Sequence, residues 1–366
     1  MKGKQVDIVL LIVTIVLLSL GVIMVLSASA PYALNMYNDS YYFFKDQFVY
    51  AVVGVILMLV ISLIDYRIYK RFAKIGLIAG VVLIALVFVP GLGVTRNQAT
   101  RWLDLGFFQF QPSELTKLAV ILFFAAVLSQ KKWREKLASS PLWFLGFLAI
   151  PGIISLILLK QPHMSAAVVI IVIAATIMFA AGAKIRYFLG LVPVGIAALV
   201  GMIAMAPYRL DRLKYWLDPW ADLQGEGWQL AQSLMAVGSG GLFGLGLGQS
   251  RQKYMYLPEQ YNDFIFAVWC EELGLIGGIF LIALFGIFIW RGIIVAMKCK
   301  DKFGSYMAVG ITAMIGVQAI FNIAVVTGTI PVTGMSLPFF SYGGSSLIIL
   351  LCATGILLNI SRNCEK

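Results

Sequence analysis

Long apolar segments recur along the 366-residue chain and restrict its fold more than any other feature. A run of about 18 apolar residues is typical of a bilayer-spanning helix, because a helix satisfies its backbone hydrogen bonds inside lipid. Charged residues make up only 12% of the chain, against about 25% in a soluble domain. The sequence therefore predicts an all-α polytopic membrane protein with ten transmembrane helices, at about residues 7–28, 47–66, 74–91, 113–130, 141–159, 164–182, 188–206, 264–290, 305–327 and 341–360.

The charges between these segments indicate the orientation. Basic loops recur at every second connection, and their side of the membrane holds eighteen of the 28 Lys and Arg residues but only five of the 17 acidic residues. Cytoplasmic loops carry such an excess of Lys and Arg. With an even number of helices, both termini are expected to be cytoplasmic. The net charge of +11 reflects this asymmetry and leaves no basic patch for a nucleic acid.

The chain is expected to form one membrane domain with its polar and aromatic loops on the outer face. The longest, a large extracellular loop at 207–263, lies between helices seven and eight. The start resembles a cleavable signal peptide, because two lysines precede an apolar run that ends in Ala28-Ser29-Ala30. A retained first helix is favoured, since residues 8–25 are long enough to span and further segments follow.

Few residues could hold a metal ion. The four cysteines form no paired motif, so neither a disulfide framework nor a CxxC metal site is indicated: Cys270, Cys299, Cys352 and Cys364. The only histidine, His163, cannot build a histidine metal site by itself, and it is expected to cap or line the outer end of the sixth helix.

Glu114 and Lys117 open the fourth segment, where ionisable side chains are costly. Three residues apart, they share a helix face, and the helix dipole favours the carboxylate nearer the N-terminus. They could form a structural ion pair that orients the helix, or the polar wall of an outward-facing cavity. The cavity is favoured, because a polar pair that faces lipid would be poorly tolerated.

Asp263 stands directly before the apolar run 264–270 at the start of the eighth segment. It could be a simple N-cap. It could equally serve as a general base at the membrane boundary, for a lipid-anchored substrate whose sugar lies in water. Glu271 and Glu272 lie deeper in the same segment and must meet a partner cation or a cavity.

Other outer motifs have two interpretations each. The glycine-rich segment 237–253 predicts a tight re-entrant or interfacial loop, or else a pyrophosphate contact through Arg251 and Lys253; no βαβ pattern supports a dinucleotide site. Residues 341–346 (SYGGSS) open the tenth helix as an anion site or as a close helix contact. Arg101 and Trp102 could bind a phosphate and a sugar, or anchor the loop at the interface.

Three stretches together resemble the SEDS family (shape, elongation, division and sporulation), to which FtsW, RodA and SpoVE belong. They are RNQATRWLDLGFFQFQPSELTKLA, GLFGLGLGQSRQKYMYLPEQYNDFIFAVWCEELG and NIAVVTGTIPVTGMSLPFFSYGGSS, which begin at residues 96, 241 and 322. The resemblance covers essentially the whole chain, and the second stretch is closer to FtsW and SpoVE than to RodA.

This resemblance implies a peptidoglycan glycosyltransferase that polymerises lipid II into β-1,4 glycan strands at the outer face of the bacterial cytoplasmic membrane, for cell division or sporulation. Asp263 matches the family's proposed general base, which would deprotonate the acceptor hydroxyl before it attacks the anomeric carbon. Arg101, Lys117, Arg251 or a divalent cation (Mg²⁺ or Mn²⁺) could stabilise the departing pyrophosphate, and no organic cofactor is implied.

The resemblance further implies a substrate-binding set: Arg101, Trp102, Glu114, Lys117, Gln249, Arg251, Ser341, Gly343, Gly344 and Ser345. The family usually has Asp after Gln-Pro where this chain has His163, which weakens any transfer of a role to that position. The implied partners are lipid II, a class B penicillin-binding protein (a transpeptidase) and other division or elongation membrane proteins.

Two other classes of function also fit a polar cavity among ten helices. One is a transporter that flips lipid II without chemistry, and the other is a non-catalytic division scaffold. The enzyme is favoured because the ionisable residues gather at one membrane face. Alternating access would rather place the site at the midplane, between broken helices.

Overall fold

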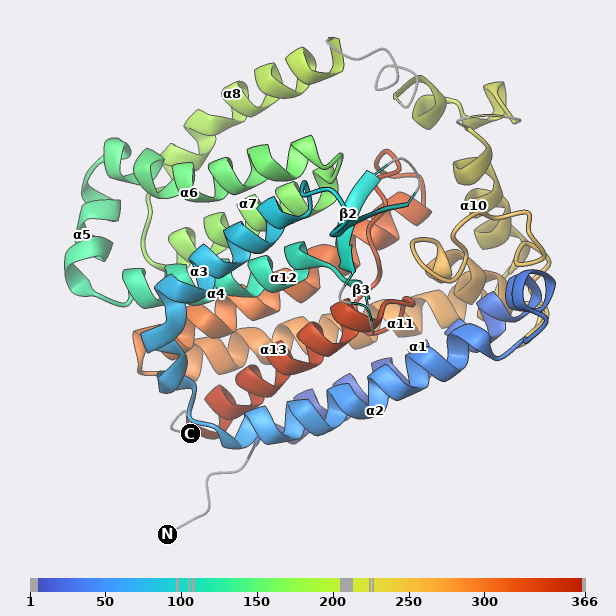
Figure 1. Cartoon of the computed structure of the whole chain (residues 1–366), viewed down its shortest axis with the longest axis horizontal. Helices are drawn as coiled ribbons and strands as arrows, with labels where there is room; N and C mark the ends of the chain where they lie inside the picture. Colours follow the sequence, from blue (N-terminus) through green and yellow to red (C-terminus); the bar gives the residue numbers. More distant parts are fainter. Residues whose placement is uncertain are drawn as a thin grey trace.

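Each of the ten expected segments carries a helix. The structure is a computed structural model that describes residues 6–96, 99–104, 106, 109–204, 213–223, 225 and 227–363. The ten helices are α1 (Ile8–Tyr37), α2 (Tyr42–Leu63), α3 (Tyr69–Leu86), α4 (Pro112–Leu128), α6 (Pro141–Lys160), α7 (Met164–Ala180), α8 (Ile185–Ala204), α11 (Ile265–Lys298), α12 (Lys302–Val326) and α13 (Gly344–Asn363) (Figure 1).

Within the described residues, six helices are long and apolar enough to cross a membrane, namely α1, α2, α6, α11, α12 and α13. A seventh candidate is α4 together with α5 (Lys131–Ser139), which turns by 94° from it. Large apolar side chains on the outward faces of these helices, such as Ile56, Leu156 and Ile279, are exposed. This is the pattern of a multi-pass membrane protein, whose outer surface meets lipid.

The basic connections meet at one end of the bundle. The backbone N–H of Asp7 donates to Ser361 Oγ (3.1 Å), so the start of α1 lies beside the end of α13. The Asp7 carboxylate also pairs with Arg291 of α11 (2.5 Å). At the same end the 3₁₀ helix η1 (Tyr66–Ile68) contacts the start of α12, where the Tyr66 hydroxyl donates to Asp301 (3.0 Å).

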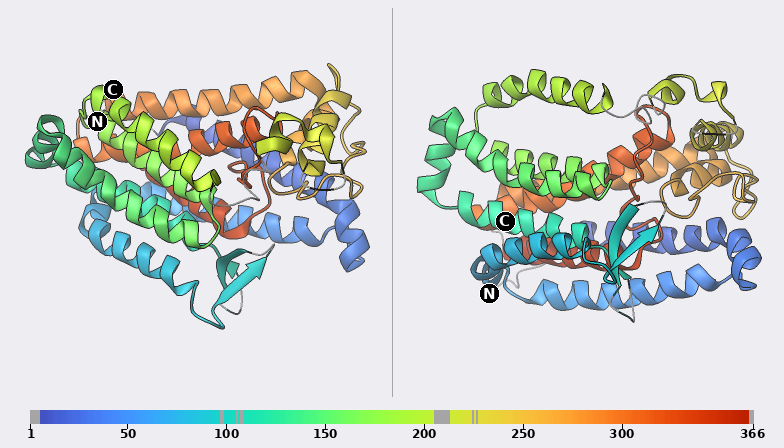
Figure 2. Two further views of the ribbon diagram at one scale, coloured as in Figure 1. Left: turned by 90° about the horizontal axis from the view of Figure 1, so that it is seen from above. Right: turned by 45° about the horizontal axis from the view of Figure 1, so that its top comes forward.

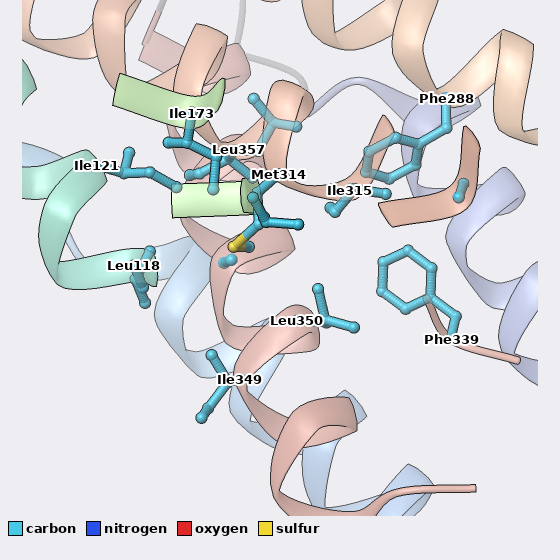
Figure 3. Close-up of a cluster of buried hydrophobic side chains, with 14 of the residues drawn as sticks. Leu118, Ile121, Ile173, Phe288, Met314, Ile315, Phe339, Ile349, Leu350 and Leu357 are labelled. Carbon is cyan, nitrogen blue, oxygen red and sulfur yellow. The ribbon is translucent and has the colours of Figure 1, made fainter. Parts of the chain in front are cut away.

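The core surrounds α12, which packs against α4, α7, α11 and α13. In Figure 3, Met314 and Ile315 of α12 lie among Ile121, Ile173 and Leu350, contributed by three other helices. All five are buried. Polar residues buried within this apolar bundle are therefore the ones that need partners, and they gather toward the end opposite the basic loops.

The expectation of an all-α fold is wrong in the second outer loop. Strands β1 (Gly93–Arg96), β2 (Ala99–Asp104) and β3 (Gln109–Phe110) form a three-stranded antiparallel sheet in the order β1-β2-β3, beside the ends of α3 and α4 (Figure 2). The segment is rich in β-branched and aromatic residues. It is too polar and charged to span the bilayer as a helix, so strand pairing satisfies its backbone instead.

The long outer loop contains structure that the sequence did not predict. It holds the 3₁₀ helix η2 (Pro219–Ala221) and α10 (Trp228–Ser239), which lie at the end opposite the basic connections (Figures 1 and 2). The tenth helix begins at Gly344 rather than at residue 341, so Ser341 belongs to the preceding loop. Residues 205–212 at the end of the seventh expected segment, the two N-terminal lysines and Cys364 lie outside the described residues.

Helix α11 is broken near its outer end, where Gly274 adopts φ 67°. The glycine-rich loop hydrogen-bonds across this break. The N–H groups of Leu245 and Gly246 donate to the carbonyls of Glu271 and Glu272 just before the break. Two further backbone hydrogen bonds run in the other direction, from the helix after the break to loop carbonyls. The backbone groups that the break would leave unpaired are therefore satisfied.

Gly274→Ala is expected to destabilise the protein by about 2 kcal/mol or more, because a positive φ is costly for alanine. A Cβ there would also lie 2.4 Å from the nitrogen of Gly244. The matched control is Gly286→Ala in the same helix, where a Cβ meets nothing within 4 Å. Thermal unfolding of the purified variants checks this, and equal midpoints for both variants would contradict it.

Candidate functional site

Asp263 lies where the long outer loop enters α11. The N-cap residue of that helix is Phe264, and no side chain caps it, so the N-cap interpretation of Asp263 is wrong. The Asp263 carbonyl accepts a hydrogen bond from Nδ2 of the buried Asn322 in α12 (2.7 Å), which also donates to the Met335 carbonyl (2.6 Å). These hydrogen bonds fix the backbone of Asp263 against α12 and the loop that follows it.

The surroundings of this carboxyl favour its protonated form. Burial raises the pKa of Asp263 to about 7, and the negative charge of Glu259 adds to this rise in pKa. Arg101 opposes the rise, because its positive charge stabilises the carboxylate. A carboxyl that titrates near neutral pH can both take up and release a proton under physiological conditions.

The loop between α12 and α13 holds the segment around Asp263 in place. The Ser341 hydroxyl donates to the Asn262 carbonyl (2.6 Å) and accepts from the Leu337 N–H (2.8 Å), and the Tyr342 N–H donates to the Tyr261 carbonyl (2.9 Å). At the other side of this loop, Ser165 at the start of α7 donates to the Thr333 carbonyl. The hydroxyl of Ser341 therefore holds this loop against the segment that precedes Asp263.

Glu114 and Lys117 form an ion pair, one of the two interpretations of their spacing, at 2.8 Å and buried. His163 is also buried and occupies the N-cap position of α7, although its side chain makes no capping hydrogen bond. Burial, together with the positive charges of Arg101 and Lys117, lowers the pKa of His163 to about 3. The imidazole is therefore neutral at physiological pH.

Arg101 connects these groups. It projects from β2, donates a hydrogen bond to the Pro162 carbonyl, and acts electrostatically on both His163 and Asp263. Strand β2, the α6–α7 connection and the start of α11 thus contribute to one electrostatic cluster, which we define as Arg101, Glu114, Lys117, His163 and Asp263. Within the described part of the chain, Glu114 Oε2 and His163 Nδ1 are buried without a hydrogen-bond partner.

The remaining predicted residues lie around this cluster rather than in it. Trp102 is half-buried on β2 opposite Val94. The hydroxyl of Ser345 accepts from the Gln111 N–H just before α4 (3.3 Å), and the Gly343 N–H donates to Gln47 (3.2 Å). These contacts join the start of α13 to the second outer loop and to α2.

Gln249 and Arg251 are exposed, and the backbone of Arg251 is bound by Glu271 (3.0 Å). Lys253, one candidate for a pyrophosphate contact, is instead buried in an ion pair with Glu272 (2.9 Å). This confirms that Glu272, one of the two deep carboxylates, pairs with a cation. Ser27 and Ser250 complete the network, with Ser27 donating to Glu272 (2.7 Å) and Ser250 to Glu271 (2.5 Å).

Sequence reasoning missed Asn322, Ser165 and the serines of this network. Their signal was a polar side chain inside or next to an apolar segment, which needs a partner when buried. Across the described residues, no group of three His, Cys, Asp or Glu side chains could hold a metal ion.

Comparison with known proteins identifies the family of this chain. Residues 8–366 match the FtsW/RodA/SpoVE family model, described as cell cycle protein. Stage V sporulation protein E of Bacillus subtilis is 46% identical over 361 residues, covering 99% of this chain and 98% of that protein. The probable peptidoglycan glycosyltransferase FtsW of Geobacter sp. (strain M18) is 42% identical over 355 residues, covering 97% and 96%.

Solved structures of similar fold belong to related proteins. A chain of a peptidoglycan synthase complex that coordinates polymerization and crosslinking matches with a TM-score of 0.78 at 28% identity, covering 98% of both chains. The rod shape determining protein RodA of Thermus thermophilus matches with a TM-score of 0.69 at 28% identity, covering 99% of this chain and 98% of that one.

Lys117→Met is expected to destabilise the protein by about 3–5 kcal/mol, because it leaves the Glu114 carboxylate buried without its cation. The double variant Glu114→Gln/Lys117→Met should recover most of this loss. Lys131→Met is the control, since Lys131 pairs with Glu135 in an exposed position. Thermal unfolding in detergent measures all three, and a Lys117→Met variant as stable as the control would refute a structural pair.

Proposed function

The chain belongs to the FtsW/RodA/SpoVE family of cell cycle proteins, and we propose that it is a peptidoglycan glycosyltransferase that polymerises lipid II into β-1,4 glycan strands. Asp263 carries the proposal. Its carboxyl caps no helix, titrates near neutral pH and stands at the outer end of the bundle, within one electrostatic cluster with Arg101.

The proposed topology has ten spans, both termini in the cytoplasm and the cluster at the outer face of the cytoplasmic membrane. The ten helices and the basic connections at one end of the bundle support it. Cytoplasmic loops are the ones rich in Lys and Arg. The cluster lies at the opposite end, where a lipid-anchored disaccharide can reach it from the outer leaflet.

In the proposed reaction, Asp263 accepts the proton of the acceptor sugar hydroxyl. The hydroxyl oxygen forms a bond to the anomeric carbon of the donor as the bond from that carbon to the pyrophosphate oxygen breaks, and undecaprenyl pyrophosphate leaves. The configuration inverts from α to β, so no covalent enzyme intermediate is required. Asp263 then releases its proton to water, and a pKa near the working pH suits both steps.

Negative charge grows on the leaving pyrophosphate, and Arg101 and Lys117 are the proposed sources of the positive charge that stabilises it. Trp102, next to Arg101 on β2, is proposed to contact the sugar of the substrate. Exposed Gln249 and Arg251, together with Gly343, Gly344 and Ser345 at the start of α13, are proposed as the outer rim of the substrate site. A divalent cation would be held by the substrate's own phosphates, because the described residues offer no cage for it.

A class B penicillin-binding protein is the proposed partner, because one structural relative belongs to a synthase complex that coordinates polymerization and crosslinking. The rival transporter function would rather place its site at the midplane, between broken helices. The break in α11 lies instead near its outer end, and the loop backbone uses the groups that it frees. The geometry thus favours the enzyme.

Asp263→Ala is expected to lower glycan polymerisation by at least about 100-fold, the contribution of a general base. The measurement uses fluorescent lipid II and the purified protein with its cognate transpeptidase, whose crosslinking is blocked. Asp39→Asn, an exposed carboxyl paired with Lys45, is the control. Equal polymerisation by a folded Asp263→Ala variant would remove the catalytic assignment. Movement of lipid II across vesicles without polymerisation by the wild type would favour the transporter.

The polymerisation rate is also expected to fall as the pH is lowered. Asp263 acts as a base only when it is deprotonated, and its pKa is about 7. The rate should therefore be constant above pH 7 and decrease about tenfold for each pH unit below it. In Glu259→Gln, loss of the neighbouring negative charge lowers the pKa of Asp263, which shifts the acidic limb to lower pH. An acidic limb at the same pH in both proteins would contradict this assignment.

A further inference from the structure

The glycine-rich loop at residues 241–248 (GLFGLGLG) exposes large apolar side chains and contains no charged residue. Leu242, Phe243 and Leu247 are 60%, 79% and 59% exposed, and Leu245 is also exposed. A contiguous apolar patch of this kind marks contact with a membrane or another protein. The proposed glycosyltransferase reaction uses none of these four side chains.

The backbone of this loop is suited to an apolar environment. Irregular backbone is tolerated at membrane depth only where its polar groups have partners in the protein. Here the N–H of Gly244 donates to Gly240, and the next two N–H groups donate to carbonyls of α11. The carbonyls of Gly241 and Leu242 accept from N–H groups of α11 beyond the break.

Two helices independently place the loop at the outer edge of the bilayer core. Gly274 is 17 residues from Arg291, which pairs with Asp7 at the inner end, and this corresponds to about 26 Å of helix. Ser27, which binds Glu272, is 20 residues from Asp7, or about 30 Å. The hydrocarbon core is about 30 Å thick, so both estimates set the loop at its outer boundary.

The apolar patch of the loop is also continuous with the lipid-facing side of α11. Leu275, Ile276 and Ile279 are each more than half exposed. The first two are hydrogen-bonded directly to the loop. The same acyl chains that cover this face of α11 can therefore cover Leu242 and Phe243.

We infer that residues 241–248 form a re-entrant segment whose apolar side chains are immersed in the acyl chains of the outer leaflet. The segment anchors the long outer loop at a fixed depth. Glu271 and Glu272 bind residues 250–253 directly above it through Ser250 and Lys253. The chain then continues to Asp263, so this anchor sets the height of the proposed base above the membrane.

The test is the depth of nitroxide labels in vesicles of phosphatidylethanolamine and phosphatidylglycerol, without any partner protein. Phe243→Cys and Leu247→Cys are labelled in a chain whose four native cysteines are replaced by alanine and whose thermal unfolding is unchanged. Gln249→Cys, exposed on the polar side, is the aqueous control. Ile276→Cys and Ile282→Cys on α11 calibrate depth, since six residues of helix separate them by about 9 Å.

We expect the labels at 243 and 247 to collide with oxygen more than with a water-soluble nickel complex, at a depth within about 5 Å of the label at 276. The label at 249 should show the reverse. Accessibility of 243 and 247 equal to that of 249 would overturn the inference. So would protection that appears only when the transpeptidase is added, because the patch would then be a protein interface.

A second measurement keeps the test independent of the cysteine replacements. Benzoyl-phenylalanine at position 243 in the native-cysteine chain should crosslink to radiolabelled phosphatidylethanolamine, whereas the same group at position 249 should not. Equal labelling at both positions would count against immersion.

Discussion

The hydrogen bonds between the glycine-rich loop and the break in α11 are the interactions on which the outer half of the structure depends. An unpaired backbone group in lipid costs several kcal/mol, so a spanning helix can break only where other backbone replaces the lost bonds. Glycine is required at the closest approach, since a Cβ at Gly244 would lie 2.1 Å from the Glu272 carbonyl oxygen. The break and the loop therefore stabilise each other.

The buried carboxylates Glu271 and Glu272 lie just before this break, and they bind residues of the long outer loop that follow the glycine-rich segment. Burial of a charge is tolerated only when it is paired and hydrogen-bonded. Lys253, Ser27 and Ser250 supply those partners. These contacts fix where the long outer loop returns to the bundle, and with it the position of Asp263.

Within the electrostatic cluster, the pKa values of two buried groups shift in opposite directions. Burial together with Glu259 raises the pKa of Asp263, while Arg101 limits the rise. His163 stays neutral beside Arg101 and Lys117. Among the described residues of the cluster, Glu114 pairs with Lys117 and Arg101 adds a further positive charge, a balance that fits the negative charge of the proposed substrate. A histidine at this position, where the family usually has Asp, makes that balance more positive.

The sequence by itself determined the helices and their order, and it predicted that the ionisable residues gather at one end of the bundle. The free energy of moving a segment into lipid depends mainly on the residues of that segment itself. The length of its apolar run and the charges of the loops beside it can therefore be interpreted without knowing the tertiary structure. The i,i+3 pair Glu114–Lys117 was likewise readable, because one helix contains both partners. The family motifs pointed to Asp263 for the same local reason.

Only the tertiary structure decided which distant residues meet. The strands around Arg101, the pairing of Lys253 with Glu272 and the role of Ser341 in the loop beside Asp263 all depend on contacts between segments far apart in sequence. Such contacts follow from how the helices pack, and the local pattern of residues does not contain that information. The pKa of Asp263 belongs to the same class, because burial and the charges of neighbouring segments set it.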